Sequence, residues 1–192
     1  MKGFKVYKNF ITDKECQQII DSLNKQESDH LQNRYEIQDY DIPQSVLDKS
    51  QEILGDEKVI ATRVQCYETG QNFDPHRDAI WYSMPKHGTA KEVWKRDRNL
   101  SISILLNDEF EGGELIIEGV DCKLEKGDAV MFSAMCLHWV QGVWEGTRYA
   151  VAVWSGTWGF EQITKEKEQE LSFNADEHFK ELLNRRRVSA NN

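Results

Sequence analysis

From Val59 onward the sequence is a series of short β-prone runs separated by tight-turn signals, and this pattern limits the fold more than any other feature. The runs are VIATRVQCY, LSISILLN, GELIIEG, DAVMFSA, LHWVQGV and TRYAVAVWSGTW. The turns between them carry Gly, Asn and Asp, as in ETG at 68–70 and KGD at 126–128. Because no helical pattern separates these runs, they predict an antiparallel barrel or sandwich rather than alternating strands and helices.

Two helices are predicted before the β-rich region. In NFITDKECQQIIDSLNK, Thr12 and Glu15 have the spacing of a capping box, and an apolar face follows them. The segment IPQSVLDKSQEIL places Pro43 near the first turn of a second helix. The core candidates of this second helix are Val46, Leu47, Ile53 and Leu54.

The chain of 192 residues is long enough for one domain with a hydrophobic core and short for two. We expect a single domain, mainly β with flanking helices. Residues 1–58 form an N-terminal helical support, residues 59–158 a β-core, and residues 159–192 a charged helical tail. The C-terminal helix is expected to pack on the outside.

Composition limits the class of protein further. Apolar residues make up 39% of the chain, no apolar run approaches the ~20 residues that span a bilayer, and the N-terminal residues lack a secretory pattern. We therefore expect a cytoplasmic protein without a membrane partner. The net charge of −9 argues against a general phosphate-binding surface. The four cysteines are scattered without Cys-x-x-Cys spacing, so neither a zinc site nor a disulfide framework is predicted.

The run YETGQNFDPHRD ends in His76-x-Asp78, two metal-binding residue types one residue apart. Alone, such a pair is close to chance in a chain of this composition. His138 gives it a partner, because it lies in the apolar β-run AMCLHWVQGV. A barrel can bring these two strands together at its mouth. The other histidines, His30, His87 and His178, lie in polar or basic surroundings and are predicted at the surface.

Two histidines and one carboxylate form the facial triad of non-haem Fe(II) oxygenases, which leaves metal positions open. Zinc is the competing metal, but the general-base Glu of a His-Glu-x-x-His helix is missing here. Arg148 lies in the mostly apolar strand TRYAVAVW and needs a partner there. A guanidinium facing into a barrel is suited to bind a carboxylate with two hydrogen bonds.

These residues resemble the Fe(II)/2-oxoglutarate-dependent dioxygenases, and among them the prolyl 4-hydroxylase-like branch. Four segments in the family's order carry the resemblance over about residues 59–158: YETGQNFDPHRD, LSISILLNDEFEGGEL, KGDAVMFSAMCLHWV and GTRYAVAVW. The opening VYKNFITDKEC helix also fits. The resemblance implies a double-stranded β-helix, or jelly-roll, core with helices packed outside.

The resemblance also implies the site. His76, Asp78 and His138 would hold Fe(II), Arg148 would bind the distal carboxylate of 2-oxoglutarate, and Tyr67 would donate its hydroxyl to the same co-substrate. O₂ would be the oxidant and ascorbate an additional cofactor. The expected reaction hydroxylates a C–H bond and converts 2-oxoglutarate to succinate and CO₂. The protein would bind, orient and shield the reacting groups.

The chain departs from the family pattern in two places. Leu105 stands where some relatives carry a second tyrosine for the co-substrate. Collagen-type enzymes use Lys at the position of Arg148, so features of different sub-branches are mixed. Arg77 lies between two expected ligands in sequence, and on an alternating strand we expect it to face away from the metal. Phe73 is expected in the core.

A peptidyl or protein prolyl residue is the favoured substrate. The stretch from Ala79 to Arg98 directly follows the ligand pair, carries five basic and two acidic residues, and would cover the barrel mouth. The substrate-contact candidates are Trp81, Tyr82, Trp94 and Arg98. Aromatic side chains suit an extended, proline-containing peptide.

Other readings stay open. The same chemistry can act on a lysyl residue, a free amino acid or a nucleobase, and a basic aromatic segment also suits nucleic acid. A non-catalytic jelly-roll binding module is the alternative from another class. The sequence does not determine the oligomeric state.

Overall fold

The computed structural model describes residues 3–23, 28–31, 34–37, 40–83 and 92–162, with the backbone alone at 28–31, 80–83, 92–96 and 158–162. The described residues divide into two units: the first lies within Met1–Trp81 and Asp97–Thr157, and the second within Tyr82–Arg96 and Trp158–Asn192. The two helices, the core and the metal-binding candidates all belong to the first unit.

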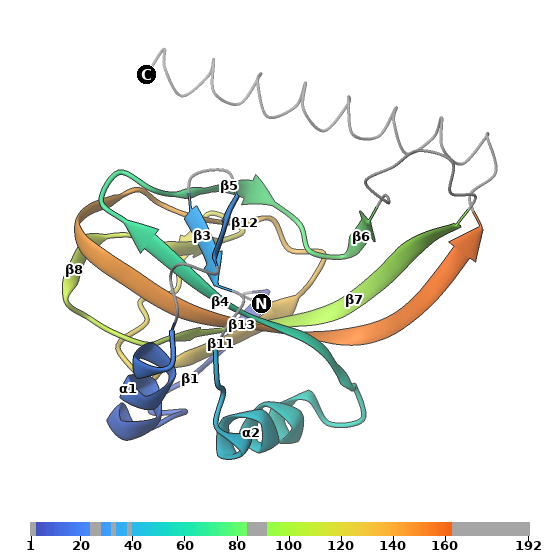
Figure 1. Cartoon of the computed structure of the whole chain (residues 1–192), viewed down its shortest axis with the longest axis horizontal. Coiled ribbons are helices and arrows are strands. Elements are labelled where there is room, and N and C mark those ends of the chain that lie inside the picture. The colour runs from blue at the N-terminus through green and yellow to red at the C-terminus, as the bar shows by residue number, and fades with distance from the viewer. Residues whose placement is uncertain (1–2, 24–27, 32–33, 38–39, 84–91, 163–192) are drawn as a thin grey trace, which may run out of the picture. The chain divides into compact units, whose positions relative to one another are not determined.

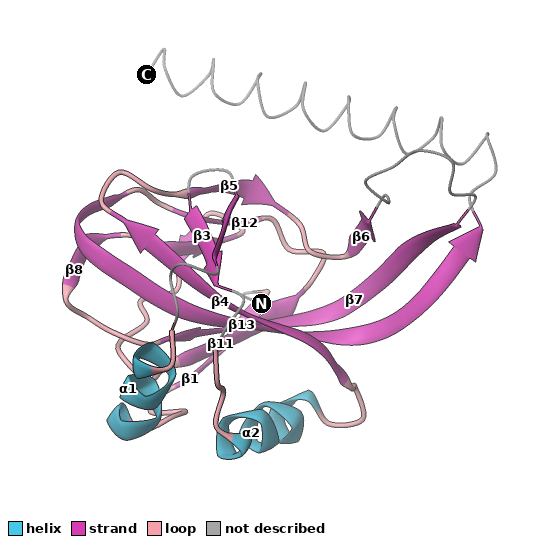
Figure 2. Cartoon of the chain, in the orientation of Figure 1, coloured by secondary structure: helices cyan, strands magenta, loops and turns pink. Residues whose placement is uncertain are grey.

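The described residues form two helices and thirteen strands (Figures 1 and 2). The helices are α1 (Asp13–Asp21) and α2 (Gln44–Leu54). The strands are β1 (Phe4–Tyr7), β2 (Ser28–Leu31), β3 (Arg34–Ile37), β4 (Val59–Glu68), β5 (Phe73–His76), β6 (Ile80–Ser83), β7 (Glu92–Leu105), β8 (Phe110–Gly112), β9 (Leu115–Ile117), β10 (Val120–Asp121), β11 (Ala129–Ser133), β12 (His138–Val140) and β13 (Val143–Gln162).

The strands make two antiparallel sheets. The larger has the order β1-β11-β7-β13-β4-β3-β2, with β6 beside β7 and β8 beside β13. The smaller has the order β10-β9-β12-β5. Strands distant in sequence are neighbours in both sheets, which is the double-stranded β-helix arrangement expected from the sequence.

The large sheet is buried on both faces, and residue alternation decides which side chains each face receives. In β13, Val151 and Val153 belong to the core cluster that contains residues of α1 and α2, and both helices lie on the same side of the sheet (Figure 1). The even positions Arg148, Ala152 and Trp154 line a cavity on the other face. β4 likewise gives the cavity the alternate residues Gln65 and Tyr67, whereas β7 contributes the consecutive residues 101–103.

The capping box predicted at Thr12 is present. The Thr12 hydroxyl accepts from the Glu15 backbone N–H at 3.2 Å, and the Glu15 carboxylate accepts from the Thr12 backbone N–H at 2.8 Å. Cys16 and Ile19 are the buried residues of α1, and Val46 and Leu54 are buried in α2. Packing against the sheet stabilises both short helices, because helices of this length are marginal alone.

The predicted fold class is confirmed, and the prediction for the N-terminal part was incomplete. Three strands, β1, β2 and β3, accompany the two predicted helices before residue 59. β1 pairs with β11 and β3 with β4, so these strands extend a sheet that the later sequence builds. Isolated four-residue strands carry too few residues for a period-two signal, which explains the omission. The predicted C-terminal helix lies outside the described residues.

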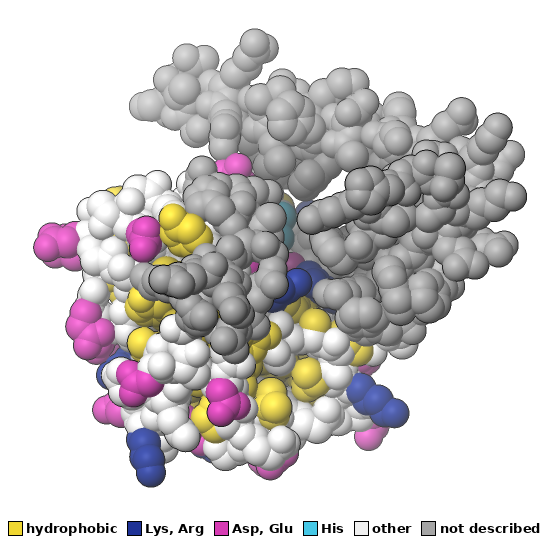
Figure 3. All heavy atoms as spheres, in the orientation of Figure 1, with side chains coloured by type: hydrophobic (Ala, Val, Ile, Leu, Met, Phe, Trp, Pro, Cys, Tyr) yellow, Lys and Arg dark blue, Asp and Glu magenta, His cyan; other side chains and the backbone are white. Residues whose placement is uncertain are grey.

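None of the described helices is long and apolar enough to cross a bilayer. On the face shown in Figure 3, acidic side chains are scattered over the described part, and basic side chains occur at separate places. The described part of this face therefore carries no broad positive patch of the kind that favours general phosphate binding.

The hydrogen bonds of Glu15 predict that the contact between α1 and α2 stabilises the protein less at acid pH. Burial alone would raise the pKa of Glu15, but hydrogen bonds from Ser45, the Thr12 backbone and Lys49 outweigh it and lower the pKa to about 2. Because the native pKa is the lower one, this stability is complete above the ordinary value of 4.5 and is lost as pH falls toward about 2. Glu15→Gln should flatten the fall in urea-unfolding stability between pH 5 and pH 2.5.

The matched control for this prediction is Glu52→Gln, which changes an exposed glutamate on α2. It should leave the pH dependence of unfolding as in the unaltered protein. Equal slopes for Glu15→Gln and the unaltered protein would contradict the assignment.

Candidate metal centre

Strand register brings the two histidines face to face. His76 ends β5 and His138 begins β12, and the two residues are direct partners across the antiparallel pair. Their ring centroids lie 4.2 Å apart. Direct cross-strand partners project from the same face of a sheet. Both imidazoles therefore point into the space between the two sheets.

Both rings are held in the same tautomer. Nδ1 of His76 lies 2.8 Å from the backbone oxygen of Asp74, and Nδ1 of His138 lies 3.1 Å from that of Cys136. A carbonyl oxygen only accepts, so in a neutral ring the proton is on Nδ1. Each Nε2 then keeps its lone pair, which is the form that binds a metal ion.

Asp78 completes the group. Its Oδ1 lies 3.6 Å from Nε2 of His76, and its Oδ2 lies 3.5 Å from Nε2 of His138. One ligand atom from each residue falls within 4.8 Å of the others. The Asp78 backbone N–H donates to the Ala134 oxygen at 2.9 Å, which ties the segment after β5 to the end of β11.

Three side chains of the large sheet hold the Asp78 carboxylate. Oδ2 accepts from the Ser101 hydroxyl at 2.8 Å and from the Trp154 indole N–H at 2.8 Å. The Arg98 guanidinium lies 3.4 Å from Oδ1 and 3.8 Å from the centroid of the Trp154 ring. The carboxylate is thereby oriented toward both histidines before any metal binds.

Electrostatics favour the metal-binding protonation states. Burial alone would raise the pKa of Asp78, but its hydrogen bond with His76 and the charges of His138 and Arg98 hold it well below its usual range. Burial, and then the charge of His76, lower the pKa of His138 to about 4. An ionised Asp78 beside a neutral His138 is therefore the state at neutral pH, which suits a divalent cation.

A stack of side chains fixes the orientation of His76. The ring of Phe73 lies against the His76 imidazole with centroids 3.8 Å apart. The Arg34 guanidinium lies 3.3 Å from the centroid of the Phe73 ring and forms an ion pair with Glu36 at 2.8 Å. Phe73 was expected to be core; it packs against the inter-sheet cluster and also supports a ligand.

Arg148 and Tyr67 are direct partners between β13 and β4 and lie on the face that lines the metal cavity. Arg148 is 2% exposed, and burial lowers the pKa of its guanidinium. Its Nε has no hydrogen-bond partner among the described residues. The Tyr67 hydroxyl donates to the Gln65 side chain at 3.2 Å, and burial raises its pKa to about 12. The phenol is therefore protonated and able to donate.

The Gly-Gly turn noted in the sequence makes room for Arg148. Gly113 has φ +67°, and a Cβ there would lie 2.9 Å from Cδ of Arg148. Gly112 has φ +75°, and a Cβ there would lie 2.4 Å from the Gly142 backbone oxygen. Both positions require glycine, because other residues are strained at such φ values and would clash.

The structure brings together all five residues that the sequence predicted for metal and co-substrate. His76, Asp78, His138, Tyr67 and Arg148 line one cavity between the sheets. Leu105 is buried and lies with Arg148 in an adjoining pocket.

The remaining predicted residues divide into two groups. Arg98 approaches Asp78, whereas the side chains of Trp81, Tyr82 and Trp94 lie outside the described part of the chain. Arg77 donates to the Met135 backbone oxygen and lies 3.7 Å from Glu118, which is an orientation away from the two histidines.

Sequence reasoning missed Ser101, Arg34 and the bond between Trp154 and Asp78. Trp154 was expected to be core or a cavity wall, and nothing in its position along the strand indicates its indole partner. Its even spacing from Arg148 is the available signal, because β13 sends even-numbered residues to the cavity. Ser101 likewise has an even spacing, four positions, from Leu105 in β7.

Comparisons with known proteins find relatives in one enzyme superfamily. The family model described as the 2OG-Fe(II) oxygenase superfamily matches residues 62–156. A PKHD-type hydroxylase from Delftia acidovorans is 33% identical over 129 residues, covering 65% of this chain and 54% of that protein. Another PKHD-type hydroxylase, from Hyphomonas neptunium, is 35% identical over 103 residues, covering 50% of this chain and 43% of that protein. The chain spans about half the length of these curated relatives.

Solved structures share the fold. A viral collagen prolyl hydroxylase from Paramecium Bursaria Chlorella virus-1, in its 2-oxoglutarate complex, superposes with a TM-score of 0.60 at 19% identity, covering 81% of this chain and 97% of that one. A prolyl hydroxylase from Trichoplax adhaerens, bound to a peptide fragment of hypoxia inducible factor, gives 0.55 at 14% identity, with 90% and 88% covered.

Removing a ligand should remove metal binding. Mn(II) serves as a stand-in for Fe(II) in this measurement. Each of the substitutions His76→Ala, Asp78→Ala and His138→Ala should weaken Mn(II) affinity by at least about 100-fold, because each deletes one of three converging ligand atoms. Anaerobic calorimetry measures this. Arg77→Ala is the matched control from the same segment and should bind Mn(II) as the unaltered protein does. Metal affinity that survives any of the three ligand substitutions would exclude this site.

Substituting a residue that hydrogen-bonds the Asp78 carboxylate should weaken Mn(II) binding measurably, but less than substituting a metal ligand does. Trp154→Phe and Ser101→Ala each remove one hydrogen bond to Oδ2, so each should weaken Mn(II) binding by roughly tenfold. Trp139→Phe changes the residue next to His138 on the opposite side of β12, and it should have no effect. Equal losses for Trp154→Phe and Trp139→Phe would indicate a general loss of packing instead.

Proposed function

Because the chain belongs to the 2OG-Fe(II) oxygenase superfamily, we propose that it is an Fe(II)- and 2-oxoglutarate-dependent dioxygenase that hydroxylates a prolyl residue in a peptide or protein. His76, Asp78 and His138 are the proposed metal ligands. Arg148 and Tyr67 are the proposed co-substrate residues. Fe(II) supplies O₂ activation when it is bound, and ascorbate is proposed as an additional cofactor.

One observation carries the proposal. The two Nε2 atoms and the Asp78 carboxylate lie within 4.8 Å of one another, and both Nδ1 atoms are hydrogen-bonded to backbone oxygens. Three protein ligands on one side of an ion leave positions for a chelating co-substrate and O₂. The set fits Fe(II) better than hydrolytic zinc, since none of the described residues that line the metal cavity is a Glu that could act as a general base.

The other residues support the co-substrate role. Arg148 is a buried cation whose Nε has no hydrogen-bond partner in the described part of the chain, and such a group is stabilised by a carboxylate that binds it bidentately. Tyr67 is fully buried, protonated and opposite Arg148 in the sheet, so its hydroxyl can donate to the same carboxylate. The apolar side chains of Phe132, Val140 and Leu115 line the same cavity, and apolar walls favour a reaction site from which water is displaced.

The proposed reaction balances as follows: 2-oxoglutarate, O₂ and a substrate C–H give succinate, CO₂ and C–OH. His76 and His138 would hold Fe(II) as neutral imidazoles and Asp78 would hold it as a carboxylate. Ser101 and Trp154 keep the Asp78 oxygens in place. The chain itself orients the partners and holds its protons at Nδ1 of both histidines and at the Tyr67 hydroxyl.

A prolyl substrate is the most specific part of the proposal. Two structural neighbours are named as prolyl hydroxylases, and one of them holds a peptide. Arg98 and Trp154 form a cation–aromatic pair beside the Asp78 carboxylate, and Arg98 is proposed as a substrate contact there. Trp81, Tyr82 and Trp94 are proposed as further substrate-contact residues.

A peptide-library assay tests the substrate. With Fe(II), 2-oxoglutarate and ascorbate, proline-containing peptides should gain one oxygen by mass spectrometry, and succinate should form in equal amount. Lysyl peptides, free amino acids and oligonucleotides belong in the same panel. If one of these other substrates is hydroxylated and prolyl peptides are not, the activity belongs to that other substrate class. If no substrate is turned over and Mn(II) does not bind, a non-catalytic binding module is favoured.

Arg148 should separate co-substrate binding from metal binding. Arg148→Ala removes the buried cation but no metal ligand, so it should weaken 2-oxoglutarate binding to the Mn(II) protein by about 100-fold while Mn(II) affinity is kept. Anaerobic calorimetry with and without 2-oxoglutarate measures both. Unchanged 2-oxoglutarate affinity would assign the carboxylate to another group.

A further inference from the structure

One peptide group connects a surface glutamate to the proposed metal ligand His138. The peptide between Cys136 and Leu137 offers its oxygen to Nδ1 of His138 at 3.1 Å. The N–H of the same peptide donates to Oε1 of Glu118 at 2.6 Å. Because the oxygen and the N–H of a trans peptide point in opposite directions in one plane, Glu118 lies behind the group that orients the His138 imidazole.

A second hydrogen bond joins the same two segments. The backbone N–H of Glu118 donates to the Leu137 oxygen at 2.8 Å, so Glu118 binds both backbone groups of the residue before the ligand. Ile117, which precedes Glu118, is the direct partner of His138 between β9 and β12. Glu118 and Leu137 therefore continue the pairing that begins at the ligand.

The backbone conformation of Glu118 is unfavourable for a glutamate. Glu118 has φ +49° and Gly119 has φ +78°. Ile117 and Val120 pair directly on either side, so these two residues form the turn between β9 and β10. Turns in which both central residues have positive φ favour the sequence Asn-Gly. A glutamate in this position is expected where its side chain has a role outside the turn.

His76 cannot be supported in the same way. Its Nδ1 bonds to the oxygen of Asp74, but the next residue is Pro75, whose backbone nitrogen carries no hydrogen. No carboxylate can therefore accept a hydrogen bond from that peptide. The ring of Phe73, stacked on the imidazole, supports His76 instead. The two histidines are thus held by different contacts.

The contact behind His138 has a chemical consequence. An anion that accepts from a peptide N–H polarises the peptide, and the oxygen of that peptide becomes a stronger acceptor. A stronger bond at Nδ1 orients the ring and makes Nε2 a more basic metal ligand. We propose that Glu118 is a positioning residue of the metal centre, which acts on His138 through the peptide between Cys136 and Leu137. The inference rests on the proposed function, because it takes His138 as a metal ligand.

Glu118→Asn separates this role from the stability of the turn. Asparagine suits positive φ, so the free energy of unfolding in urea should be unchanged or higher. The asparagine side chain is one methylene shorter and uncharged, so Mn(II) affinity in anaerobic calorimetry should fall by about fivefold. Glu118→Gln keeps the length and an oxygen acceptor, and should lose only about twofold.

The proton on Nδ1 of His138 gives a direct readout of the hydrogen bond. In the metal-free protein, its proton NMR resonance should move upfield in Glu118→Asn, because the bond to the Cys136 oxygen weakens. The corresponding resonance of His76 should not move, since its acceptor is the Asp74 oxygen. A residue that only supported the fold would not shift one histidine alone.

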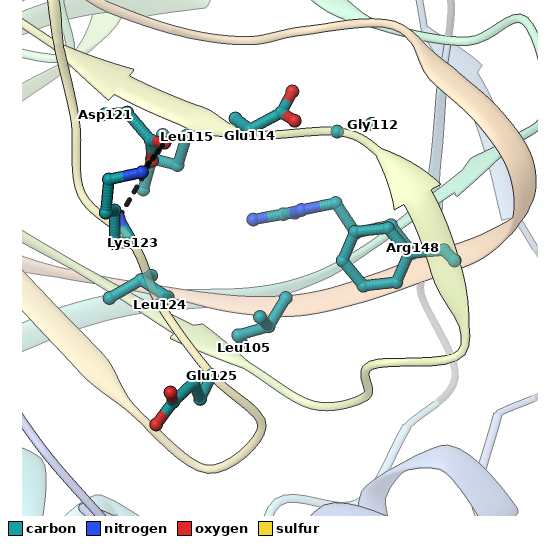
Figure 4. Close-up of a pocket in the computed structure, with 11 residues that line it drawn as sticks. Leu105, Gly112, Glu114, Leu115, Asp121, Lys123, Leu124, Glu125 and Arg148 are labelled. Atoms are coloured by element: carbon teal, nitrogen blue, oxygen red, sulfur yellow. Dashed lines mark hydrogen bonds and ion pairs between the residues drawn. The ribbon is translucent and has the colours of Figure 1, made fainter.

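Two variants serve as matched controls. Lys123 also has a positive φ, +50°, and pairs with Asp121 at 3.3 Å (Figure 4). Lys123→Asn makes the same kind of change at a second left-handed position and should alter neither Mn(II) affinity nor the His138 resonance. Arg77→Ala removes the ion pair with Glu118 at 3.7 Å but leaves the Leu137 bond, so it should also preserve both.

The possible failures are distinct. If Glu118→Asn leaves either the Mn(II) affinity or the His138 resonance unchanged, the positioning role is overturned and the metal centre is kept. Equal losses of affinity in Glu118→Asn and Lys123→Asn would overturn it as well. If the unaltered protein does not bind Mn(II), the proposed metal centre itself is wrong.

Discussion

The buried carboxylate of Asp78 is the group on which the rest of the site depends. Its backbone is tied to Ala134, and its side chain accepts hydrogen bonds from Ser101 and Trp154 and lies near both histidines. These contacts come from both sheets. A 7% exposed anion would be costly without them, so the sheet packing and the ligand geometry are stabilised by the same bonds.

Arg148 is the opposite case, a buried cation that the described residues leave partly unsatisfied. Asp78 and Arg148 line one cavity, yet the protein gives the carboxylate several donors and leaves Nε of the guanidinium without an acceptor. Desolvating a charge costs several kcal/mol unless it is paired. Under the proposed function, a bound dicarboxylate would offset that cost at Arg148 and would contribute oxygens at the metal, so that one small molecule would satisfy two separate centres.

Much of this arrangement was predictable from sequence. The short strands after Val59 predicted the fold class, and Arg148 in an apolar strand predicted a buried cation facing a cavity. Pairings across the sheets were less accessible. That Trp154 reaches Asp78 depends on the register of β13 against its neighbours, and a single strand gives its own period but not its register. The three N-terminal strands were missed because their pairing, rather than their composition, forms them.

One of those N-terminal strands, β3, also reaches the candidate metal site. Arg34 of β3 lies on one face of Phe73, and the His76 imidazole lies on the other. Glu36 holds Arg34 and also lies 3.6 Å from Arg63 of β4. A ligand at the end of a short strand such as β5 has few backbone bonds to fix it, so its orientation depends on this stack. The N-terminal residues therefore position His76 as well as supporting the sheet, and the fold and the metal geometry are established by the same contacts.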